Sequence, residues 1–239
     1  MTQGIFVTGT DTDVGKTFAS VALLREMSAR GARVFGLKPV AAGAEQTAQG
    51  WRNEDALSLM AASSVALPYE QVNPVCLPAA LAPHIAARQA GRRLHCGQLI
   101  GWVRGALATP ADLALVEGAG GWRTPLSERE MLSRLPQELA LPVILVVALR
   151  LGCLNHALLT AEAIRHDGVR LLGWIGNVRD LAMPAWAENQ ATLQALLAAP
   201  CLALLGPQGQ LLQPWDLTPL HGFAAVLAQN GLGGGMTGG

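Results

Sequence analysis

Near its N-terminus the chain carries a glycine-bounded loop between a short apolar run and a segment of helical character. The apolar run is Gly4-Ile5-Phe6-Val7, and the loop reads Gly9-Thr10-Asp11-Thr12-Asp13-Val14-Gly15-Lys16-Thr17. A strand, a loop and a Gly-Lys-Thr that opens a helix form the setting in which a phosphate-binding loop works. Backbone N–H groups of such a loop and the positive end of the helix both attract phosphate oxygens. The pattern therefore predicts a nucleotide-phosphate site.

The side chains of this loop suit that role. Lys16 would reach the terminal phosphates, and the Thr17 hydroxyl would ligate Mg²⁺. Gly9 and Gly15 enclose one residue more than the usual pattern, and Thr10 stands where a glycine is usual. The first half of the loop must therefore have its own shape. A chance Gly-Lys-Thr at a helix start is the alternative, and the position directly after an N-terminal strand disfavours it.

Apolar runs alternate with stretches of helical spacing along the chain. The runs are Ile5–Thr8, Val34–Pro39, Leu113–Glu117, Val143–Ala148, Leu171–Asn177 and Leu202–Gly206. The helical stretches are Lys16–Arg30, Glu54–Ala62, Gln98–Ala108, Ser127–Ala140, Asn155–His166 and Ala185–Ala198. Short apolar strands that alternate with helices are typical of a parallel sheet covered on both faces. We predict a three-layer α/β/α P-loop NTPase-like domain with a mostly parallel central sheet.

Length and composition set the domain organisation. The 239 residues suit one α/β domain, and 51% of them are hydrophobic, enough for a large core. We find no internal repeat and no linker, so residues 1–230 are predicted to form a single domain. The glycine-rich end, residues 231–239, has too little apolar surface to offset its ordering entropy and is predicted to be disordered.

Charge and cysteine usage exclude several classes of function. The formal net charge is zero, which argues against nucleic acid or an anionic membrane surface as the main partner. No basic segment followed by an apolar signal is present, and no apolar run approaches the roughly 20 residues of a membrane helix. Cys76, Cys96, Cys153 and Cys201 show no CxxC pairing and no metal spacing with histidines. They indicate reduced thiols of a cytoplasmic protein, with a packing role.

Charged or amide side chains stand at the ends of the expected strands, where chemistry gathers in open α/β sheets. Lys38 ends the second run, Glu117 ends the third before a glycine-rich turn at residues 118–121, and Asn177 ends the fifth. Mg²⁺ on nucleotide phosphates takes hard oxygen ligands, usually one or two carboxylates. Glu117 and Asp55 are the candidates.

Two alternatives for these ligands remain open. Asp11 and Asp13 compete because they lie in the loop itself, and Asp55 could equally serve as a charge or cap at the start of a helix. Lys38 could be a solvated lysine, although the following proline and small residues favour a position over the site. Two lysines and a metal on phosphate form the apparatus of phosphoryl transfer.

Five motifs in register closely resemble the dethiobiotin synthetase family. They are the phosphate loop Gly9–Thr17, Lys38-Pro39-Val40, Pro83-His84-Ile85, Val116-Glu117-Gly118-Ala119-Gly120-Gly121-Trp122 and Leu151-Gly152-Cys153-Leu154-Asn155-His156-Ala157. The extra residue of the loop is itself a feature of that family. The resemblance runs from about Ile5 to about Gly206 and is weakest beyond Ala185.

The resemblance implies a cytoplasmic ligase of biotin biosynthesis. It would close the ureido ring of dethiobiotin from 7,8-diaminopelargonic acid, CO2 and MgATP, and release ADP and phosphate. It would proceed through a carbamate and a carbamic-phosphoric anhydride. The implied catalytic residues are Lys38, Lys16 and Thr12, and the metal ligands are Thr17, Asp55 and Glu117. The implied nucleotide site comprises Asp13, Val14, Gly15, Lys16, Thr17, Phe18, Asp55, Glu117, Gly118, Ala119 and Gly120, with Asn177, Gly206 and Pro207 at the adenine. The implied substrate residues are Lys38, Ala42, Gly152, Cys153, Leu154 and Asn155.

The resemblance also implies a homodimer with the substrate at the interface. The substrate carboxylate would meet backbone N–H groups of Gly152–Asn155 of the neighbouring subunit, which suits a helix N-terminus. A tight strand-to-helix turn capped by Asn155 is the alternative for this segment. Ala42 replaces a serine that is usual in the family, and losing one hydrogen bond costs about 0.5–1.5 kcal/mol, so weaker substrate binding is expected.

Two other classes share parts of this pattern. Partner-binding ATPases of the chromosome-partitioning or septum-site type usually carry a lysine near the start of the loop, which residues 8–12 lack. Cobyrinic acid diamide synthetases add a glutaminase domain, which the residues after Gly206 are too few to form. A catalytically silent homologue is disfavoured because Lys16, Lys38 and both candidate carboxylates are present.

Overall fold

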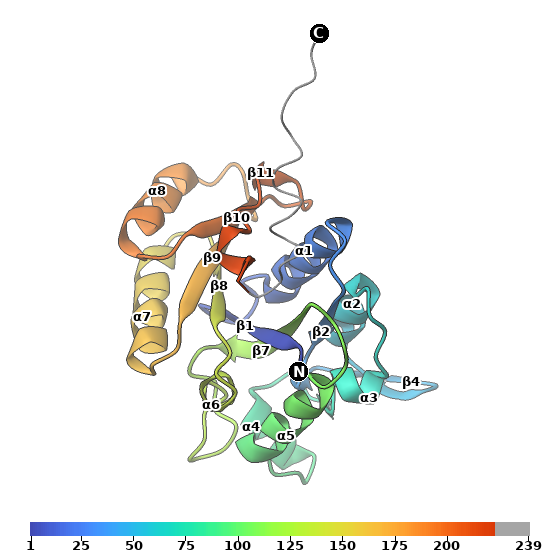
Figure 1. Cartoon of the computed structure of the whole chain (residues 1–239). Coiled ribbons are helices and arrows are strands. Elements are labelled where there is room, and N and C mark those ends of the chain that lie inside the picture. The colour runs from blue at the N-terminus through green and yellow to red at the C-terminus, as the bar shows by residue number, and fades with distance from the viewer. Residues whose placement is uncertain (223–239) are drawn as a thin grey trace.

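The computed structural model describes residues 1–222 of the chain. A seven-stranded sheet forms its centre, with the strand order β11-β10-β9-β8-β1-β7-β2. The strands are β1 (Gln3–Gly9), β2 (Val34–Leu37), β7 (Leu113–Gly121), β8 (Val143–Ala148), β9 (Leu171–Asn177), β10 (Cys201–Leu205) and β11 (Leu211–Gln213). Every pairing is parallel except that of β11 with β10. The predicted mostly parallel sheet is confirmed (Figure 1).

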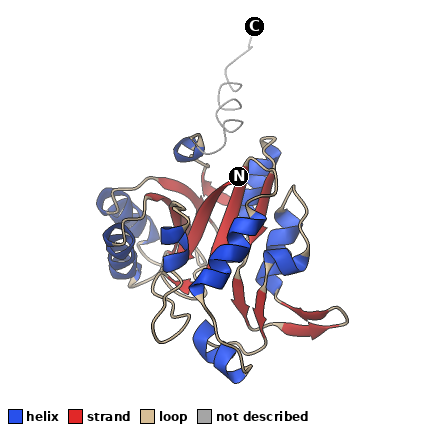
Figure 2. Cartoon of the chain, turned by 60° about the horizontal axis from the view of Figure 1, so that its bottom comes forward, coloured by secondary structure: helices blue, strands red, loops and turns tan. Residues whose placement is uncertain are grey.

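Helices cover both faces of this sheet. They include α1 (Lys16–Ala29), α2 (Glu54–Ala62), α5 (Cys96–Ala106), α6 (Arg134–Glu138), α7 (Cys153–His166) and α8 (Trp186–Leu196). Successive side chains of a strand point to opposite faces, so Ile5 and Val7 join the core cluster with α1 and α2, whereas Phe6 joins the cluster with α5 and α6. Figures 1 and 2 show the resulting three layers.

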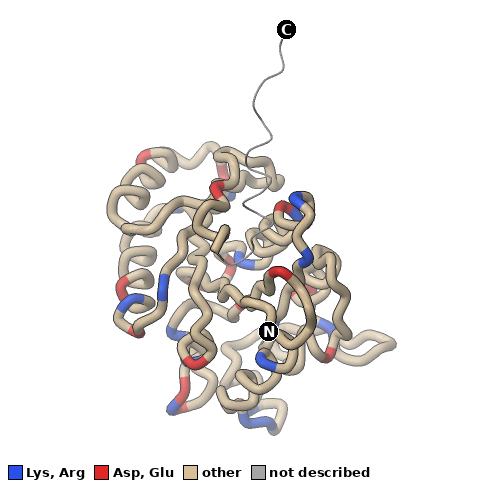
Figure 3. Tube along the Cα trace, in the orientation of Figure 1, with Lys and Arg blue, Asp and Glu red and all other residues tan. Residues whose placement is uncertain are grey.

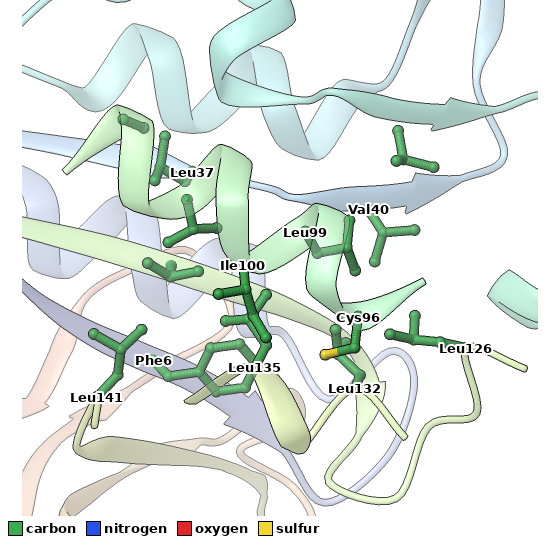
Figure 4. Packing of buried hydrophobic residues seen from close by; sticks show 14 of the residues in the cluster. Phe6, Leu37, Val40, Cys96, Leu99, Ile100, Leu126, Leu132, Leu135 and Leu141 are labelled. Atoms are coloured by element: carbon green, nitrogen blue, oxygen red, sulfur yellow. The ribbon is translucent and has the colours of Figure 1, made fainter. Parts of the chain in front are cut away.

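The core on the second face lies beneath α5 and α6 (Figure 4). Phe6, Ile100, Leu135 and Leu141 are all buried there. Full burial of such a side chain contributes about 1.5–3 kcal/mol. This packing fixes β1 and β7, whose carboxyl ends carry the candidate site.

The helix predicted over Ser127–Ala140 is wrong in its first half, because only α6 is helical there. The Leu126 N–H donates to the Glu130 carbonyl, and the Ser127 hydroxyl accepts from the Glu130 N–H. Pro125 also forms a β-bridge with Met131. A hydroxyl that bonds the backbone two or three residues ahead favours a turn over a helix.

The glycine-rich turn predicted at residues 118–121 is also wrong, because β7 continues to Gly121, although its pairing with β1 shifts register after Glu117 and Gly120 has a φ of +61°. Gly121 pairs with Gly9 of β1. A Cβ on Gly118 would lie 2.8 Å from Cζ of Phe6. These glycines therefore let the strand pass close over the core instead of turning it.

Several short elements carry no sequence signal that we detect. They are β3 (Val40–Ala42) paired with β6 (Val75–Leu77), the hairpin of β4 (Glu45–Thr47) and β5 (Gly50–Arg52), α3 (Tyr69–Val72), α4 (Pro83–Gln89) and η1 (Thr218–Leu220). Strands of three residues are too short for a period-2 pattern, so tertiary pairing decides them.

The four cysteines are free thiols in the structure, and three of them are buried. Burial raises the pKa of the Cys96 thiol and of the Cys201 thiol to about 12. Acidic and basic residues are scattered along the trace (Figure 3). Within residues 1–222, none of the helices combines the length and the apolar character that a membrane crossing requires. The tail predicted to be disordered, residues 231–239, lies outside the described residues.

Helix α5 offers a direct test of helix stability. Gly97, Gly101 and Gly105 share its exposed side, and a Cβ added at any of them would meet nothing within 4 Å. Glycine in a helix interior costs about 0.5–1 kcal/mol relative to alanine. We expect Gly101→Ala to raise the free energy of unfolding in urea by about that amount. The control Gly91→Ala, where φ is +66°, should lower it because an L residue is strained there.

Candidate active site

The carboxyl ends of β1, β2 and β7 open into one cavity of about 1010 Å³. One end of the cavity is formed by the phosphate-binding loop together with Lys38 and Asp55. The rest is lined mainly by apolar groups, among them Ala41, Ala42, Leu81, Pro83, Trp122, Pro125 and Leu159, together with the polar side chains of Arg123, Thr124 and Thr160. The cavity therefore joins a charged end to a mainly apolar end.

The phosphate-binding loop is held in place by contacts from distant parts of the chain. Gly15 caps α1 with φ 87°, a left-handed conformation. The Asn177 amide at the end of β9 donates to the Val14 carbonyl at 3.0 Å. The Arg179 guanidinium donates to the Asp13 carbonyl at 2.9 Å, and the Lys16 ammonium donates to the Asp11 carbonyl at 2.9 Å. Val14 is itself buried in the core beside α1.

Three side chains from different elements meet beside this loop. The Lys38 ammonium lies 2.6 Å from Oε1 of Glu117 and 2.9 Å from Oδ2 of Asp55. The Thr17 hydroxyl donates to the same Oε1 at 2.7 Å. Lys38 is 4% exposed and Glu117 is fully buried, whereas Asp55 is 42% exposed and faces the cavity. The pairing of β1 and of β2 with β7 brings Thr17, Lys38 and Glu117 together. The helix α2, which packs against β2 and α1, adds Asp55.

The charges of this cluster shift the affinities of its members for protons. Burial opposes the charge of Lys38, but the carboxylates of Glu117 and Asp55 outweigh burial and hold its pKa above the ordinary value. Burial likewise disfavours ionised Asp55, yet the Lys38 ammonium outweighs it and keeps the pKa of Asp55 below its usual range. Burial, assisted by the charge of Lys38, lowers the pKa of Lys16 to about 8.

Lys16 and Lys38 are the only lysines in the sequence. Protein labelled with ¹³Cε-lysine should therefore give two lysine signals. We expect one to titrate near pH 8 and the other to stay charged up to pH 10.5. Between pH 8 and 10.5 the unfolded chain would hold a proton that folded Lys16 has lost, so this lysine makes stability rise with pH. Two coincident titrations near 10.5 would contradict the assignment.

The oxygen atoms of the cluster suit a hard divalent cation. Oε2 of Glu117 is buried and has no hydrogen-bond partner, which is costly for a carboxylate oxygen unless a ligand completes it. Within the described part of the chain, no three His, Cys, Asp or Glu side chains are grouped so that they alone could hold a metal ion. Mg²⁺ commonly takes one or two carboxylates and completes its shell with phosphates and water. Thr17, Asp55 and Glu117 fit that requirement.

The backbone of Lys38 is fixed by the last residue of α3 and the residue that follows it. Its N–H donates to the Val72 carbonyl at 2.9 Å, and its carbonyl accepts from the Asn73 amide at 2.6 Å. Asn73 is 3% exposed. Sequence reasoning missed Asn73, and its place before Pro74 signals only a turn.

Asn53, not Asp55, caps α2, whereas Asp55 lies in the first turn of that helix, where its charge also suits the helix dipole. The Asn53 side chain caps α2 by accepting from the Ala56 N–H. Asp55 is thereby free to pair with Lys38 across the cavity floor. Of the two rival ligands, Asp11 accepts from the Thr12 N–H at 2.7 Å and lies 3.6 Å from the Arg150 guanidinium. Asp13 also lines the cavity, so the structure leaves it as an alternative.

Apart from residues 152–155, the residues predicted for the site fall into three groups by their position relative to the cavity. Those that line the cavity are Thr12, Asp13, Gly15, Lys16, Thr17, Phe18, Lys38, Ala42, Asp55, Ala119 and Gly120. Val14, Glu117, Gly118 and Asn177 lie in the buried layer beneath it. Gly206 and Pro207 fall between Leu205 and Gln208, which line a second hollow of about 450 Å³ that also includes Phe18. Sequence reasoning missed the walls formed by residues 121–125 and by α7.

The segment Gly152–Asn155 lies at the start of α7 and lines neither of these cavities. Gly152 is the N-cap, with φ 89°, and no side chain caps this helix. The alternative of Asn155 as a cap is therefore wrong. The neighbouring Leu151 is 95% exposed. An uncapped helix start beside an exposed leucine forms an open surface.

Comparisons with known proteins place this geometry in a family. A family model described as an AAA domain matches residues 3–214. The ATP-dependent dethiobiotin synthetase BioD of Cellvibrio japonicus is 55% identical over 203 residues, which cover 85% of this chain and 89% of that protein. The chain belongs to the dethiobiotin synthetase family. A dethiobiotin synthetase BioD of Pseudomonas aeruginosa is 57% identical over 197 residues, covering 82% and 86%. The family predicted from the motifs is thus confirmed.

Solved structures agree on the fold of this dethiobiotin synthetase family member at much lower identity. The signal recognition particle receptor FtsY from Elizabethkingia anophelis in complex with GDP gives a TM-score of 0.52 at 16% identity, covering 94% of this chain and 64% of that chain. The chain thus spans less than two thirds of that receptor. The septum site-determining protein MinD of Pyrococcus horikoshii complexed with Mg-ADP gives 0.51 at 15%, covering 97% and 90%. Both show the fold alone.

Proposed function

We propose that this chain is an ATP-dependent dethiobiotin synthetase, a ligase of biotin biosynthesis. It converts 7,8-diaminopelargonic acid, CO2 and ATP into dethiobiotin, ADP and phosphate. The observation that carries the proposal is the convergence of Lys16, Thr17, Lys38, Asp55 and Glu117 at one end of a cavity in a member of this family. Phosphoryl transfer depends mainly on such positioning and charge stabilisation.

ATP and Mg²⁺ occupy the charged end. The loop N–H groups and the start of α1 bind phosphate oxygens. Thr17, Asp55 and Glu117 would hold the metal, which would supply positive charge to the phosphates. The positive charges of Lys16 and Lys38 balance the negative charges of Asp55 and Glu117. A divalent cation that bound alone would therefore leave the site with excess positive charge, which nucleotide phosphates would neutralise. Asn177, Gly206 and Pro207 meet the adenine. Asn177 also supports the loop through the Val14 carbonyl.

The reaction proceeds in three steps. One amine of the substrate adds to CO2 and loses a proton, which gives a carbamate. A carbamate oxygen attacks the γ-phosphorus and ADP leaves, which gives a carbamic-phosphoric anhydride. The second amine attacks the carbonyl carbon, loses a proton and expels phosphate, which closes the ureido ring. Lys16 and Lys38 stabilise the carbamate and the charge that grows on the transferred phosphoryl group, and Thr12 and the loop hold the phosphates.

The apolar end of the cavity receives the methylene chain of the diamine, because the transfer of hydrocarbon from water to apolar walls is favourable in free energy. Ala42 borders this region, and its methyl group offers no hydrogen bond to the carbamate. The backbone carbonyl of Ala42 accepts from the Asn53 side-chain amide at 3.3 Å, and this contact does not involve the methyl group. We expect Ala42→Ser to tighten diamine binding.

The active form is a homodimer. The carboxylate end of the diamine reaches the backbone N–H groups of Gly152–Asn155 of a second copy, and the uncapped start of α7 and the exposed Leu151 support this arrangement. The free thiols suit a cytoplasmic location. From the composition we propose that neither nucleic acid nor a membrane is a partner. We also propose that residues 1–230 form a single domain.

The test is ADP release from MgATP and bicarbonate with and without 7,8-diaminopelargonic acid, with mass spectrometry for dethiobiotin. We expect ADP formation to require the diamine and to match dethiobiotin formed. Steady ATP hydrolysis that ignores the diamine would reject the proposal and favour a septum-site type of ATPase. Sedimentation velocity at assay concentrations tests the dimer, and an active monomer at high dilution would reject the shared site.

A further inference from the structure

One carboxylate far from the phosphate end joins two walls of the cavity. Asp167 ends α7, and its side chain is 10% exposed. Its Oδ2 accepts from the Trp122 indole N–H at 2.8 Å. The Arg123 guanidinium donates to Oδ1 at 2.8 Å and lies 2.7 Å from Oδ2 as its ion-pair partner. The Gln137 amide adds a contact of 3.3 Å.

The position of this carboxylate is unfavourable for its own helix. A negative charge at a helix C-terminus is opposed by the helix dipole, and basic residues are the ones that suit the last turn. Asp167 is the C-cap of α7. Its contacts lie instead on residues 122, 123 and 137, so its stabilisation comes from the segment after β7 and from α6. A bidentate guanidinium–carboxylate pair is among the stronger and geometrically more specific polar contacts.

Both partners of this contact belong to cavity walls. Residues 121–125 line one side of the cavity, and Leu159, Thr160 and Ala163 of α7 line another. Trp122 is 3% exposed and packs edge-on against Phe6, with ring centroids 6.3 Å apart. Asp167 therefore ties the wall after β7 to the helix that supplies another part of the cavity wall.

We propose that Asp167 is a positioning residue that sets the spacing of these two walls around the substrate chain. The inference rests on the proposed function, because the walls belong to the apolar end assigned to the diamine. Asp167 touches no reacting group. Without its charge, residues 121–125 would lose their attachment to α7, and the diamine would be held less firmly in the reactive position. The phosphate end would keep its shape, because Lys16, Asn177 and Arg179 hold the loop and Gly121 pairs with Gly9 without any contact to Asp167.

The kinetic test compares Asp167→Asn with wild type and with the control Glu162→Gln, which removes an exposed carboxylate from the same helix. Loss of a charge-assisted contact should raise KM for the diamine about tenfold. We expect kcat to change less than about twofold and KM for ATP to stay constant, since the binding of one substrate alone is weakened. Asp167→Glu, which keeps the charge, should recover part of the affinity.

A second measurement reads the contact without turnover. In ¹⁵N-labelled protein the indole N–H of Trp122 is assigned by its disappearance in Trp122→Phe. We expect this resonance to move in Asp167→Asn and to exchange with solvent about tenfold faster in Asp167→Ala, because one hydrogen bond is lost. Arg123→Met should raise KM for the diamine while the indole bond to Asp167 stays. The Arg123→Met variant therefore tests the Arg123–Asp167 ion pair even if the Asp167 variants fold poorly.

Two results would overturn the proposal. One is a Trp122 resonance that does not respond to Asp167→Asn. The other is a resonance that responds while KM for the diamine stays at the wild-type value in both Asp167→Asn and Arg123→Met. Failure of the proposed function would look different, because the wild-type protein itself would then release no ADP in response to the diamine.

Discussion

Replacing Lys38 with methionine should lower diamine-dependent ADP formation by about a hundred- to a thousandfold, the usual effect of removing one preorganised charge from a reacting centre. Lys38 is 4% exposed and lies within 3 Å of both Glu117 and Asp55. No other lysine except Lys16 exists in the chain to replace its charge. Steady-state ADP release with saturating diamine measures the effect. A variant with full activity would remove Lys38 from the mechanism.

The same change should also weaken the fold. Methionine would leave Glu117 fully buried without its ammonium partner, and breaking a buried pair in this way costs about 3–5 kcal/mol. Lys38→Arg is the matched control, because it keeps the charge but not the ammonium geometry. We expect Lys38→Arg to unfold nearly as wild type does while it still loses most of the activity. Urea unfolding monitored beside the assay separates the two effects.

Alanine at Gly15 should reduce the affinity for MgATP more than tenfold. A Cβ at this position would lie 1.9 Å from Nδ2 of Asn177, and φ is +87°. The left-handed conformation alone costs an L residue about 1–2 kcal/mol. The clash would in addition displace the amide that holds the Val14 carbonyl, so the loop N–H groups would lose their alignment. Isothermal titration calorimetry with MgATP measures the loss.

Gly31 provides the control for this prediction. Its φ is +86°, nearly that of Gly15, but an added Cβ would meet nothing within 4 Å. Gly31→Ala should therefore lose a similar amount of stability from backbone strain and bind MgATP as wild type does. If Gly15→Ala bound MgATP equally well, the proposed alignment of the loop by Asn177 would be wrong.

Local signals in the sequence predicted the framework well. The strands β8 and β9 and the helix α2 have the predicted bounds, and α1 begins at the predicted Lys16. These elements combine an apolar pattern with a clear start or stop signal, such as the Asn53 cap of α2. The prediction failed where competing contacts come from close neighbours, as with the Ser127 hydroxyl before α6. It also failed at Gly118–Gly121, where the same glycines suit either a turn or a close-packed strand.

The motifs identified the candidate residues, but they did not predict which of these side chains contact one another. A motif indicates that Lys38 and Glu117 occur at strand ends. It does not indicate that the Lys38 ammonium bridges Glu117 and Asp55, because these residues lie 79 and 17 positions away from it. The order of strands in the sheet determines which ends become neighbours. The supporting contacts of Asn73 and Asn177 have no sequence pattern of their own.

The sequence by itself determined the phosphate-binding loop, the alternation of strands and helices, and the family. The loop and the alternation depend on residues close together in the chain, where periodicity and turn chemistry act. The family depends on several short motifs, each of which is a run of neighbouring residues. Only the tertiary structure decided which charges pair, how Gly15 meets Asn177, and that Asp167 at the end of α7 holds Trp122 and Arg123. Such contacts depend on distances between elements, which packing of the whole core sets and no local pattern encodes.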